Sequence, residues 1–359
     1  MNTKFKINLN SKLIKYISIL GLILIWIATI LNNINNKQTI NTDNINFYKS
    51  KEAAFIGDNM IFAQNLDGGW NKRIYKKSLF KFFDILHFKY KKLFLTSSID
   101  NDATVTEIEY LSKLYTETKI TKYKKSAMKD IRYLLKIQYP NGGFPQRASK
   151  ASLEYQYQIT FNDRAMINVL QLFKDIIDKK EQYSYIDPHT YEKIITSYNK
   201  GIDCILKTQM TSGMWAAQYD RKKLTPCYGR TYEPPAIDTR ESADIVLFLM
   251  KIDNPSNEIK NSIEKAVNWY NENAIKNKEL KTCNQNKYSV LKLVNCSACK
   301  PIWARFYDIN KNIPIFSDRS KVIKYNISEI NQERMFSYDW YISSGNIVLD
   351  NYKNWKTKN

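Results

Sequence analysis

The chain is poor in the residues from which most protein zinc sites are built. It has only two histidines, His87 and His189, and both lie far from its cysteines in the sequence. Cys296 and Cys299 form one CxxC pair with Cys283 upstream, but a second CxxC pair is missing. A structural zinc site needs four such ligands, so the sequence disfavours one. The cysteine count of five is odd, and a Cys296–Cys299 or a Cys283–Cys299 disulfide is compatible with an oxidising compartment.

Acidic residues are scarce relative to basic ones. The 359 residues include 35 Asp and Glu against 55 Lys and Arg, which gives a formal net charge of +20. Such a charge attracts nucleic acid, an anionic membrane or an acidic polysaccharide. The basic residues do not form one compact block, so lysines scattered over solvated faces account for the charge equally simply. Because no stretch resembles a recognised nucleic-acid motif, we expect no nucleic-acid partner.

A short apolar run near the N-terminus predicts export. Residues 16–31 carry no charge and follow several lysines, which is the pattern of an export signal or a membrane anchor. As a helix this run spans about 24 Å, slightly less than the ~30 Å hydrocarbon core of a bilayer. Extension back to Leu13, with Lys15 reaching the interface, nearly closes the gap. No pair of small residues marks a cleavage site, so we expect an anchor through residues 13–31, with a cleaved signal as the alternative.

This segment sets the expected organisation of the chain. Residues 1–31 are the export signal or anchor, the Asn-rich residues 32–46 are a linker, and residues 47–359 form the folded domain. The positive flank of the apolar run places the N-terminus in the cytoplasm and the remainder outside. We therefore expect a secreted or periplasmic protein, or one anchored to the outer face of the cytoplasmic membrane.

Strand-like alternation with hairpin turns is also scarce. The chain is 43% hydrophobic and 13% aromatic, so it can bury a substantial core. Apolar residues three and four positions apart predict amphipathic helices in residues 52–63, 106–115, 165–173 and 243–250. The tail at residues 314–341 is less regular and predicts short strands or loops. The expected fold class is therefore dominated by α-helix.

A short motif occurs three times along the chain. It consists of a glutamine, a glycine four residues later and an aromatic residue two beyond, at Gln64–Trp70, Gln138–Phe144 and Gln209–Trp215. The copies begin 74 and 71 residues apart, and each lies where a helical pattern ends, as a C-terminal glycine does. A unit of about two helices buries its apolar face only against its neighbours. The repeat predicts an α/α toroid with these loops at one end, and three unrelated helix caps are the alternative.

Two acidic phrases and three isolated arginines are the candidates for chemistry. The phrases are Ile-Asp-Asn-Asp at residues 99–102 and Ile-Thr-Phe-Asn-Asp at residues 159–163. Carboxylate and carboxamide oxygens are the ligands that a hard cation such as calcium prefers. Arg230, Arg305 and Arg319 offer the planar donor groups that best hold an acidic sugar or a phosphate. The pattern predicts a metal ion held against a polyanion.

Each of these candidates also has a plainer interpretation. Asp100 and Asp163 precede helical patterns, where either would serve as an N-cap. Arg305 lies in an aromatic setting and would stack on Trp303 or Tyr307. Arg319 would form a surface ion pair.

Several stretches of the chain, in order from about residue 47 to the C-terminus, resemble the pectate lyases of polysaccharide lyase family 10. The likeness is carried by residues 98–104, 138–146, 159–166, 201–209, 230–235, 303–307, 316–319, 333–334 and 340–341. The resemblance implies an (α/α)3 toroid with irregular loops and a few short strands near the C-terminus. It also implies calcium-dependent cleavage of polygalacturonate, so the expected partner is that polymer or a related acidic polysaccharide. We expect the protein to be a monomer.

The resemblance implies roles for individual residues. Asp100 and Asp163 match calcium-ligand positions, and Asn101 matches a substrate contact. Arg230 and Arg305 match arginines that hold the carboxylates of the substrate. These roles require residues far apart in the sequence to meet in one cleft.

Arg319 matches the proton-abstracting arginine of the family. Cleavage by β-elimination removes the C5 proton of a uronate, which is weakly acidic while the adjacent carboxylate keeps its full charge. Calcium on that carboxylate, with an arginine opposite, stabilises the developing charge. A guanidinium is an awkward base because its pKa exceeds 12, and nearby cations and exclusion of water would have to lower it. If they do not, Arg319 stabilises charge and another group takes the proton.

Two positions depart from the family pattern. Asp102 stands where a small residue is usual, and Ser320 stands where an acidic residue is usual. Both lie next to predicted site residues and put the rate and the substrate range in question. The first alternative function is a catalytically silent protein that binds acidic polysaccharide on the same scaffold. A nucleic-acid-binding helical protein and an inverting glycoside hydrolase, which needs paired catalytic carboxylates, are the others.

Overall fold

The computed structural model describes residues 44–71, 97–147, 153–285 and 288–358. The predicted anchor at residues 13–31 and nearly all of the predicted linker lie outside these ranges. Among the described residues, no helix is both long enough and apolar enough to cross a bilayer.

Helices account for most of the described structure. The α-helices are α2 (Lys51–Ala63), α4 (Val105–Thr118), α5 (Thr121–Ile137), α6 (Ala165–Ile177), α7 (Pro188–Thr208), α8 (Thr239–Leu249), α9 (Asn257–Glu272), α10 (Gln332–Phe336) and α11 (Ser344–Lys356). Short 3-10 helices are η1 (Ile45–Lys49), η2 (Asp100–Asp102), η3 (Glu154–Tyr157), η4 (Asn162–Arg164), η5 (Glu181–Tyr183) and η6 (Ile327–Glu329).

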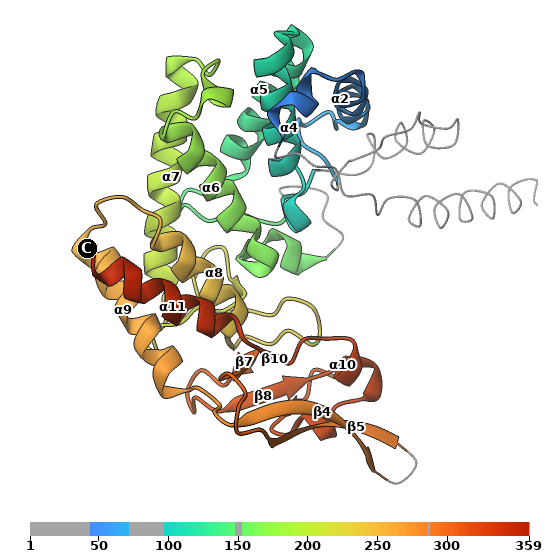
Figure 1. Cartoon of the computed structure of the whole chain (residues 1–359), viewed down its shortest axis with the longest axis vertical. Helices are drawn as coiled ribbons and strands as arrows, with labels where there is room; N and C mark the ends of the chain where they lie inside the picture. The colour runs from blue at the N-terminus through green and yellow to red at the C-terminus, as the bar shows by residue number, and fades with distance from the viewer. Residues whose placement is uncertain (1–43, 72–96, 148–152, 286–287, 359) are drawn as a thin grey trace, which may run out of the picture.

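The described helices pack in two rows, as the repeat predicts. α4, α6 and α8 contact one another in turn and form an inner row, and α5, α7 and α9 form an outer row. Each inner helix packs against the outer helix that follows it, so three helical hairpins stand side by side (Figure 1). α2 packs on α4 and α5, and α11 packs on α8 and α9. The expected (α/α)3 toroid is confirmed.

Burial distinguishes the two rows. α6 buries most of its circumference, including Met166, Ile167, Val169 and Leu170, because α4, α7 and α8 all pack against it. α5 buries an apolar stripe and keeps Lys125 and Arg132 exposed, as a helix with one solvated face does. The inner row therefore positions the residues that lie at the ends of its helices.

The glutamine of each repeat closes its loop and ties that loop to the next outer helix. The Nε2 atoms of Gln64, Gln138 and Gln209 donate to the carbonyl of the glycine four residues later, at 2.7, 2.9 and 2.7 Å. The same amides donate to serine carbonyls on α5, α7 and α9, namely Ser126, Ser197 and Ser262. Three matching sets of bonds at equivalent positions confirm the repeat and rule out three unrelated helix caps.

The glycine of each loop is required by both its conformation and its surroundings. The φ angle is 121° at Gly68, 90° at Gly142 and 88° at Gly213, in the region that residues with a Cβ rarely adopt. A Cβ atom on Gly142 would lie 1.9 Å from the carbonyl oxygen of Lys200 on α7. The first loop follows α2, and the other two lead from α5 toward α6 and from α7 toward α8. The equivalent bonds of the three loops place them at one end of the toroid.

Short antiparallel strands complete the described fold, mostly after α9. β3 (Ile237–Asp238), β7 (Phe306–Tyr307), β8 (Pro314–Ser317) and β9 (Ile323–Lys324) form one sheet in that order. β1 (Ile159–Thr160) pairs with β2 (Gln218–Tyr219), and β6 (Trp303–Ala304) pairs with β10 (Tyr341–Ile342). The predicted strands in the tail at residues 314–341 are thus found.

One hairpin was not predicted. β4 (Lys278–Gln285) pairs over its full length with β5 (Tyr288–Asn295). Its first strand reads Lys-Glu-Leu-Lys-Thr-Cys-Asn-Gln, which is mostly polar and lacks the alternation that marks a half-buried strand. The apolar residues of the hairpin are mostly on β5, where Val290 and Leu291 pack against the C-terminal strands.

Packing divides the described core into three clusters. The largest runs through the hairpins from α4 to α11, and a second lies between α2 and the outer faces of α4 and α5. The third lies among the C-terminal strands, where Phe306, Phe316 and Trp340 pack on Met335. The strand-rich part therefore has its own core beside the end of the toroid.

Candidate active site

The three inner helices begin close together, and an aspartate stands at each beginning. Asp100 opens η2 before α4, Asp163 lies in η4 before α6, and Asp238 directly precedes α8. η2 packs against η4, and η4 packs against α8. The repeat is the cause, because it places every outer-to-inner loop at the same end of the toroid. Asp100 and Asp163, which the sequence predicts as metal ligands, are thereby brought to neighbouring turns.

The N-cap interpretation of these two aspartates is wrong. α4 starts after Thr104 and α6 starts after Arg164, so neither aspartate caps the helix that follows it. Their turns instead enter the left-handed region, with φ of 49° at Asn101 and 50° at Asp163. Asparagine and aspartate are among the side chains that tolerate this region best. Both carboxylates are therefore left for a partner other than the helix end.

The negative charge of Asp100 is unfavourable at its position. Burial raises the pKa of Asp100, a hydrogen bond with Gln146 opposes the rise, and the charge of Asp163 adds to it. A cation between two such carboxylates would relieve this repulsion. The donor set consists of carboxylate oxygens with the carboxamide of Asn101 beside them, which is the chemistry of a calcium site. Calcium takes about six to eight oxygens, so water and a ligand carboxylate would complete the shell.

Two arginines accompany the acidic pair. Arg240, in the first turn of α8, brings Nη2 to 3.9 Å from Oδ1 of Asp163. Arg164 forms an ion pair with Asp244 on α8. Burial raises the pKa of Asp244 even though the charge of Arg164 lowers it. We call Asp100, Asn101 and Asp163 with their turns the acidic half of the site.

The predicted arginines gather around two tyrosines. The rings of Tyr232 and Tyr338 meet edge to face, with their centres 5.3 Å apart. The guanidinium carbons of Arg230, Arg319 and Arg334 lie 5.3, 5.9 and 4.3 Å from the centre of the Tyr232 ring. Aromatic rings attract such cations, so one tyrosine holds three positive charges within reach of one another. We call this cluster, together with Arg305, the arginine half of the site.

Carboxylates hold Arg230 and Arg319 in different ways. Arg230 forks onto the buried Glu233 with bonds of 2.6–3.0 Å. Although burial opposes both effects, this pairing lowers the pKa of Glu233 and raises the pKa of Arg230. Arg319 is 62% exposed and shares Glu333 with Arg334, with two bonds of 3.2 Å. The surface ion pair considered for Arg319 is thus present.

Arg305 is buried beneath the tyrosines. Its side chain is 3% exposed, and it reaches Asp238 at 3.3 Å and Glu241 at 3.2 Å. Its guanidinium carbon lies 4.7 Å from the centre of the Tyr338 ring and 5.6 Å from that of the Phe306 ring. The predicted contact with an aromatic ring is thus found, but its partners are Tyr338 and Phe306 and not the predicted Trp303 or Tyr307. Burial, followed by the charge of Asp238, raises the pKa of Glu241. In this conformation Asp238 and Glu241 both pair with the guanidinium of Arg305. Arg305 therefore links the beginning of α8 to the arginine half of the site.

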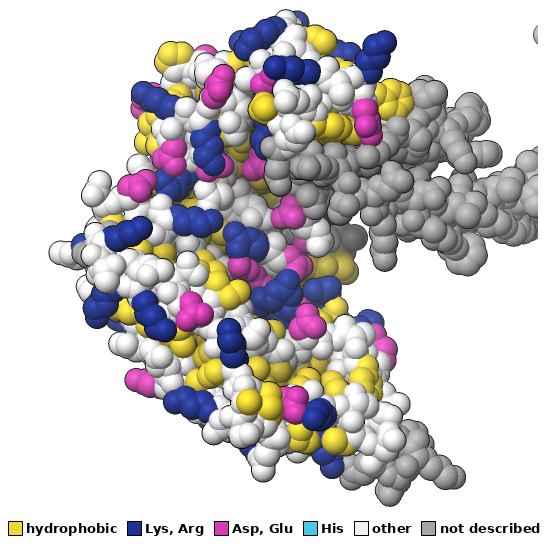
Figure 2. Space-filling model, in the orientation of Figure 1, with side chains coloured by type: hydrophobic (Ala, Val, Ile, Leu, Met, Phe, Trp, Pro, Cys, Tyr) yellow, Lys and Arg dark blue, Asp and Glu magenta, His cyan; other side chains and the backbone are white. Residues whose placement is uncertain are grey.

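The acidic half and the arginine half meet at the beginning of α8. Asp238 pairs with Arg305 on one side, and Arg240 reaches toward Asp163 on the other. The pKa of Tyr155 on η3 depends on charges in both halves. Burial raises this pKa, the charge of Arg230 lowers it and the charge of Asp100 raises it. Figure 2 shows acidic and basic side chains side by side where this face is hollowed between the helical and strand-rich parts. This surface presents arginines to an anionic ligand, next to carboxylates suited to a cation.

Sequence reasoning assigned no role to several residues of this site. Tyr232, Glu233 and Arg334 lie inside stretches that carry the family resemblance, so a role was discoverable there. Tyr338 lies outside those stretches, and its contacts with Arg305, Tyr232 and Glu233 reveal it. Arg240 is the second residue of α8, and no sequence pattern indicated a role for it.

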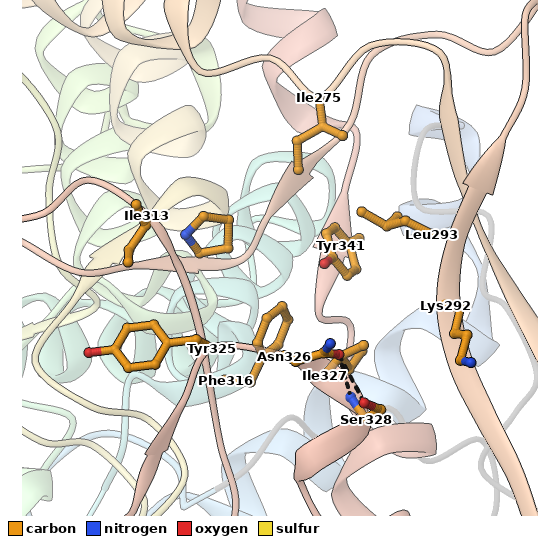
Figure 3. Close-up of a pocket in the computed structure, with 11 residues that line it drawn as sticks. Ile275, Lys292, Leu293, Ile313, Phe316, Tyr325, Asn326, Ile327, Ser328 and Tyr341 are labelled. Atoms are coloured by element: carbon orange, nitrogen blue, oxygen red, sulfur yellow. Dashed lines mark hydrogen bonds between the residues drawn. The ribbon is translucent and has the colours of Figure 1, made fainter.

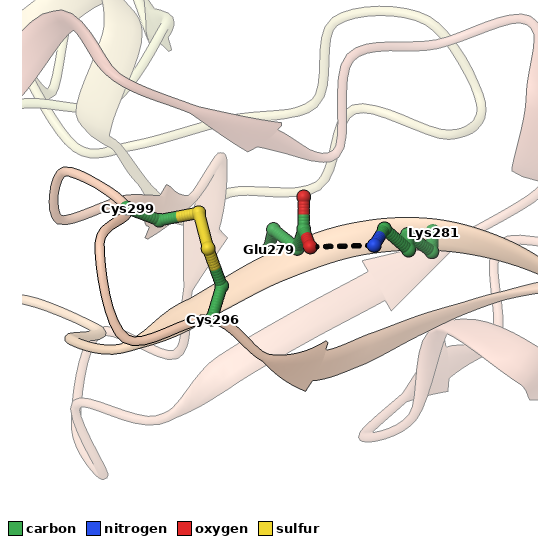
Figure 4. Close-up of a disulfide and its surroundings, with 4 residues drawn as sticks. All are labelled: Glu279, Lys281, Cys296 and Cys299. Atoms are coloured by element: carbon green, nitrogen blue, oxygen red, sulfur yellow. Dashed lines mark ion pairs between the residues drawn. A yellow bond between two sulfur atoms is a disulfide. The ribbon is translucent and has the colours of Figure 1, made fainter.

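The cysteines adopt one of the two pairings that the sequence left open. Cys296 and Cys299 form a disulfide at the base of the β4/β5 hairpin, beside Glu279 (Figure 4). Glu279 pairs with Lys281 at 2.7 Å. Cys283 is a free thiol on β4, so the alternative Cys283–Cys299 bridge is wrong. The bridge joins residues on either side of a turn that follows β5 and lies away from the acidic pair.

A cavity of about 650 Å³ lies in the strand-rich part, under β5 and against β8 and η6 (Figure 3). Its lining is mixed, and it includes Phe316, Tyr325, Tyr341 and Lys292. None of the predicted site residues lines it. The charged surface between the two halves, and not this cavity, is therefore the candidate active site.

Comparison with known proteins identifies the family of the chain. The profile of the pectic acid lyase family matches residues 64–349. A family 10 polysaccharide lyase from Cellvibrio cellulosa has a TM-score of 0.73 and 25% identity, covering 87% of this chain and 95% of its own. A mutant of that lyase in complex with trigalacturonic acid gives 0.72 and 25%, covering 86% and 95%. A comparison with curated proteins finds no match. The chain therefore belongs to the pectic acid lyase family.

Proposed function

We propose that this polysaccharide lyase is a calcium-dependent pectate lyase that cleaves polygalacturonate by β-elimination, with Arg319 as the proton-abstracting residue. The observation that carries the proposal is the meeting of Asp100 and Asp163 on neighbouring turns, next to a cluster of arginines. The structural neighbour was crystallised with trigalacturonic acid, which supports an acidic polysaccharide as the substrate. A polyuronate presents one carboxylate on every sugar, and this site offers several positive groups to receive them.

The reaction proposed is an elimination within one sugar of the chain. A base removes the C5 proton, the electrons of that bond form a C4–C5 double bond, and the C4–O bond to the neighbouring sugar breaks. The departing oxygen then takes a proton. The barrier lies mainly in the charge that develops beside C5, so donors fixed around the carboxylate lower it. Arg230, held in the charged state by Glu233, is suited to that role.

Calcium is proposed to bind the acidic half through Asp100 and Asp163, with Asn101 contacting the substrate. When bound, the ion supplies a Lewis acid that withdraws charge from the uronate carboxylate. The chain itself contributes the fixed left-handed turns that hold these oxygens in place. Asp102, which departs from the family pattern, accepts a hydrogen bond from Asn168 at 2.5 Å, so it has a partner on α6.

Arg230, Arg305 and Arg319 pair with different carboxylates, and this difference supports Arg319 as the base. Glu233 raises the pKa of Arg230, and Asp238 raises the pKa of Arg305, in both cases against the effect of burial. These two arginines therefore keep their protons and act as fixed charges. Arg319 instead bonds to an exposed carboxylate, Glu333, that it shares with Arg334. Water is the alternative base, with Arg319 stabilising charge.

The test is an ultraviolet assay for the unsaturated product, using the full-length protein with polygalacturonate and calcium. We expect turnover that a chelator abolishes, and an Arg319→Ala variant whose kcat falls by about 10³-fold. Arg132→Ala is the matched control, because Arg132 is an exposed arginine on the outer helix α5. Turnover that survives both the chelator and Arg319→Ala contradicts the mechanism. Binding of the polymer without new absorbance supports the silent binding protein instead.

We also propose that the protein is exported and acts as a monomer. The lysine-flanked apolar run at residues 13–31 supports export and attachment to the outer face of the cytoplasmic membrane. The substrate agrees with this location, because a long polysaccharide outside the cell is reached only by an exported enzyme. Fractionation of cells, followed by detection of the chain in the membrane or in the medium, distinguishes an anchor from a cleaved signal.

A further inference from the structure

Arg240 lies where the acidic half and the arginine half meet, and the catalytic scheme above does not use it. It is in the first turn of α8, and its backbone N–H donates to Oδ1 of Asp238 at 3.0 Å. This cap fixes the backbone of Arg240 at the end of the toroid where Asp100 and Asp163 lie. The fold therefore fixes the backbone from which the Arg240 side chain extends. The contacts of the side chain itself set the direction in which it points.

Those contacts are weaker than the contacts of the neighbouring arginines. Arg230 and Arg305 are each hydrogen-bonded to buried carboxylates. Within the described part of the chain, the guanidinium of Arg240 has Asp163 as its carboxylate partner, at 3.9 Å. This separation exceeds a hydrogen bond but still gives Coulomb attraction. The side chain is also 41% exposed, so it neutralises Asp163 without being locked in place.

We propose that Arg240 is a movable cation of the active site with two positions. In the metal-free protein it screens the charge of Asp163. When calcium is held by the aspartates, Arg240 turns toward solvent and binds a carboxylate of the uronate chain. This inference rests on the proposed function, because it assigns Arg240 to the same substrate and the same metal.

Charge is the physical reason for two positions. A calcium ion at Asp163 repels a guanidinium that also approaches Asp163, so the two cations compete for one carboxylate. A uronate chain brings carboxylates of its own, and an arginine fork binds a carboxylate through two parallel hydrogen bonds. Arg240 therefore weakens calcium binding in the metal-free site and strengthens substrate binding in the calcium-bound site.

The test measures two constants that must move in opposite directions. In calorimetric titration of the full-length protein with calcium alone, Arg240→Ala should bind the ion about three- to tenfold more tightly, because a competing charge is gone. In the ultraviolet assay with saturating calcium, the same variant should show a KM for polygalacturonate about tenfold higher, with kcat changed less. General damage to the site would weaken both kinds of binding, so it does not reproduce this pattern.

Two matched variants sharpen the result. Arg240→Lys keeps the charge and loses the fork, so its calcium affinity should stay near wild type while its KM rises part of the way. Arg132→Ala removes one exposed positive charge from α5, and it should leave both constants unchanged.

Failure of this inference and failure of the proposed function look different. Calcium binding in Arg240→Ala that is unchanged or weaker, or a KM equal to that of Arg132→Ala, overturns the role of Arg240 while the wild-type enzyme remains an active lyase. A wild-type protein that neither binds calcium nor eliminates overturns the proposed function, and this inference with it.

Discussion

The acidic half and the arginine half of the site rest on different kinds of structure. Asp100 and Asp163 stand at equivalent helix beginnings, and three matching glutamine-glycine loops set the spacing of those helices. Arg230 and Arg305 stand on irregular segments, and buried carboxylates hold their side chains. Backbone repetition therefore positions one half, and charge pairing positions the other. The two halves should fail in different ways when each is disturbed.

The largest expected effect comes from breaking the repeat. Gly142→Ala places a Cβ atom 1.9 Å from the carbonyl oxygen of Lys200, at a φ of 90°. We expect the free energy of unfolding to fall by more than about 4 kcal/mol, because neither backbone is free to yield. Urea denaturation followed by circular dichroism measures the loss.

A second glycine of the same repeat calibrates this result. At Gly213 the nearest contact of an added Cβ atom is 2.8 Å, so Gly213→Ala should cost less than Gly142→Ala. A loss below about 1 kcal/mol at Gly142, the range of ordinary surface changes, would show that the repeat loop does not fix the helix spacing.

A smaller loss is expected from breaking the pairing that holds the arginine half. Arg305→Met leaves Asp238 and Glu241 buried without their cation, and removal of one partner from a buried ion pair costs about 3 kcal/mol or more. Arg319→Met is the matched control, since its ion pair is exposed and such pairs contribute about 0–1 kcal/mol. The measurement is the urea midpoint of both variants in the same buffer.

The pH dependence gives this comparison a second readout. Burial raises the pKa of both Asp238 and Glu241, and without Arg305 these carboxyls should protonate more readily still. The deficit of Arg305→Met should therefore shrink as the pH falls from 7 toward 5. Equal midpoints for Arg305→Met and Arg319→Met at pH 7 would mean that the buried pairing does not hold this half together.

The same difference explains what could be predicted from the sequence. The Gln-Gly-aromatic spacing predicted the toroid and the common end of its loops, because a repeated motif encodes a repeated backbone position. The resemblance then singled out Asp100 and Asp163, and the fold places them together. The polar strand β4 gave no periodic signal, because its residues do not alternate between apolar and polar.

The details of the arginine half were less accessible. The sequence named Arg230, Arg305 and Arg319, but it did not indicate that Arg305 is buried or that Tyr338 lies over it. These facts depend on contacts between residues far apart in the chain, such as Tyr338 with Glu233 at 3.1 Å. No local pattern encodes such a contact, because each partner alone is an ordinary residue of an irregular loop.

The smallest expected effect is a gain in the free energy of unfolding when a carboxylate of the acidic half is neutralised. The same kind of change in the arginine half should lower that free energy. Burial, together with the charge of Asp163, raises the pKa of Asp100, so its charged form costs stability at neutral pH when calcium is chelated. Asp100→Asn should therefore raise the free energy of unfolding by about 1 kcal/mol at pH 7. That advantage should fade as the pH falls toward 4, because the folded wild-type protein takes up its proton first.

Glu233 should behave in the opposite way. Burial alone would raise its pKa, but the hydrogen bonds and charge of Arg230 outweigh burial and lower it. A lowered pKa means stability that is present above the ordinary glutamate range and is lost as the pH falls through the folded-state value. Glu233→Gln should therefore destabilise the chelated protein at pH 7, where Asp100→Asn stabilises it. If both variants shifted the thermal midpoint in the same direction, neutralising a carboxylate would have the same effect on stability in both halves. The acidic half would then be stable without a bound cation.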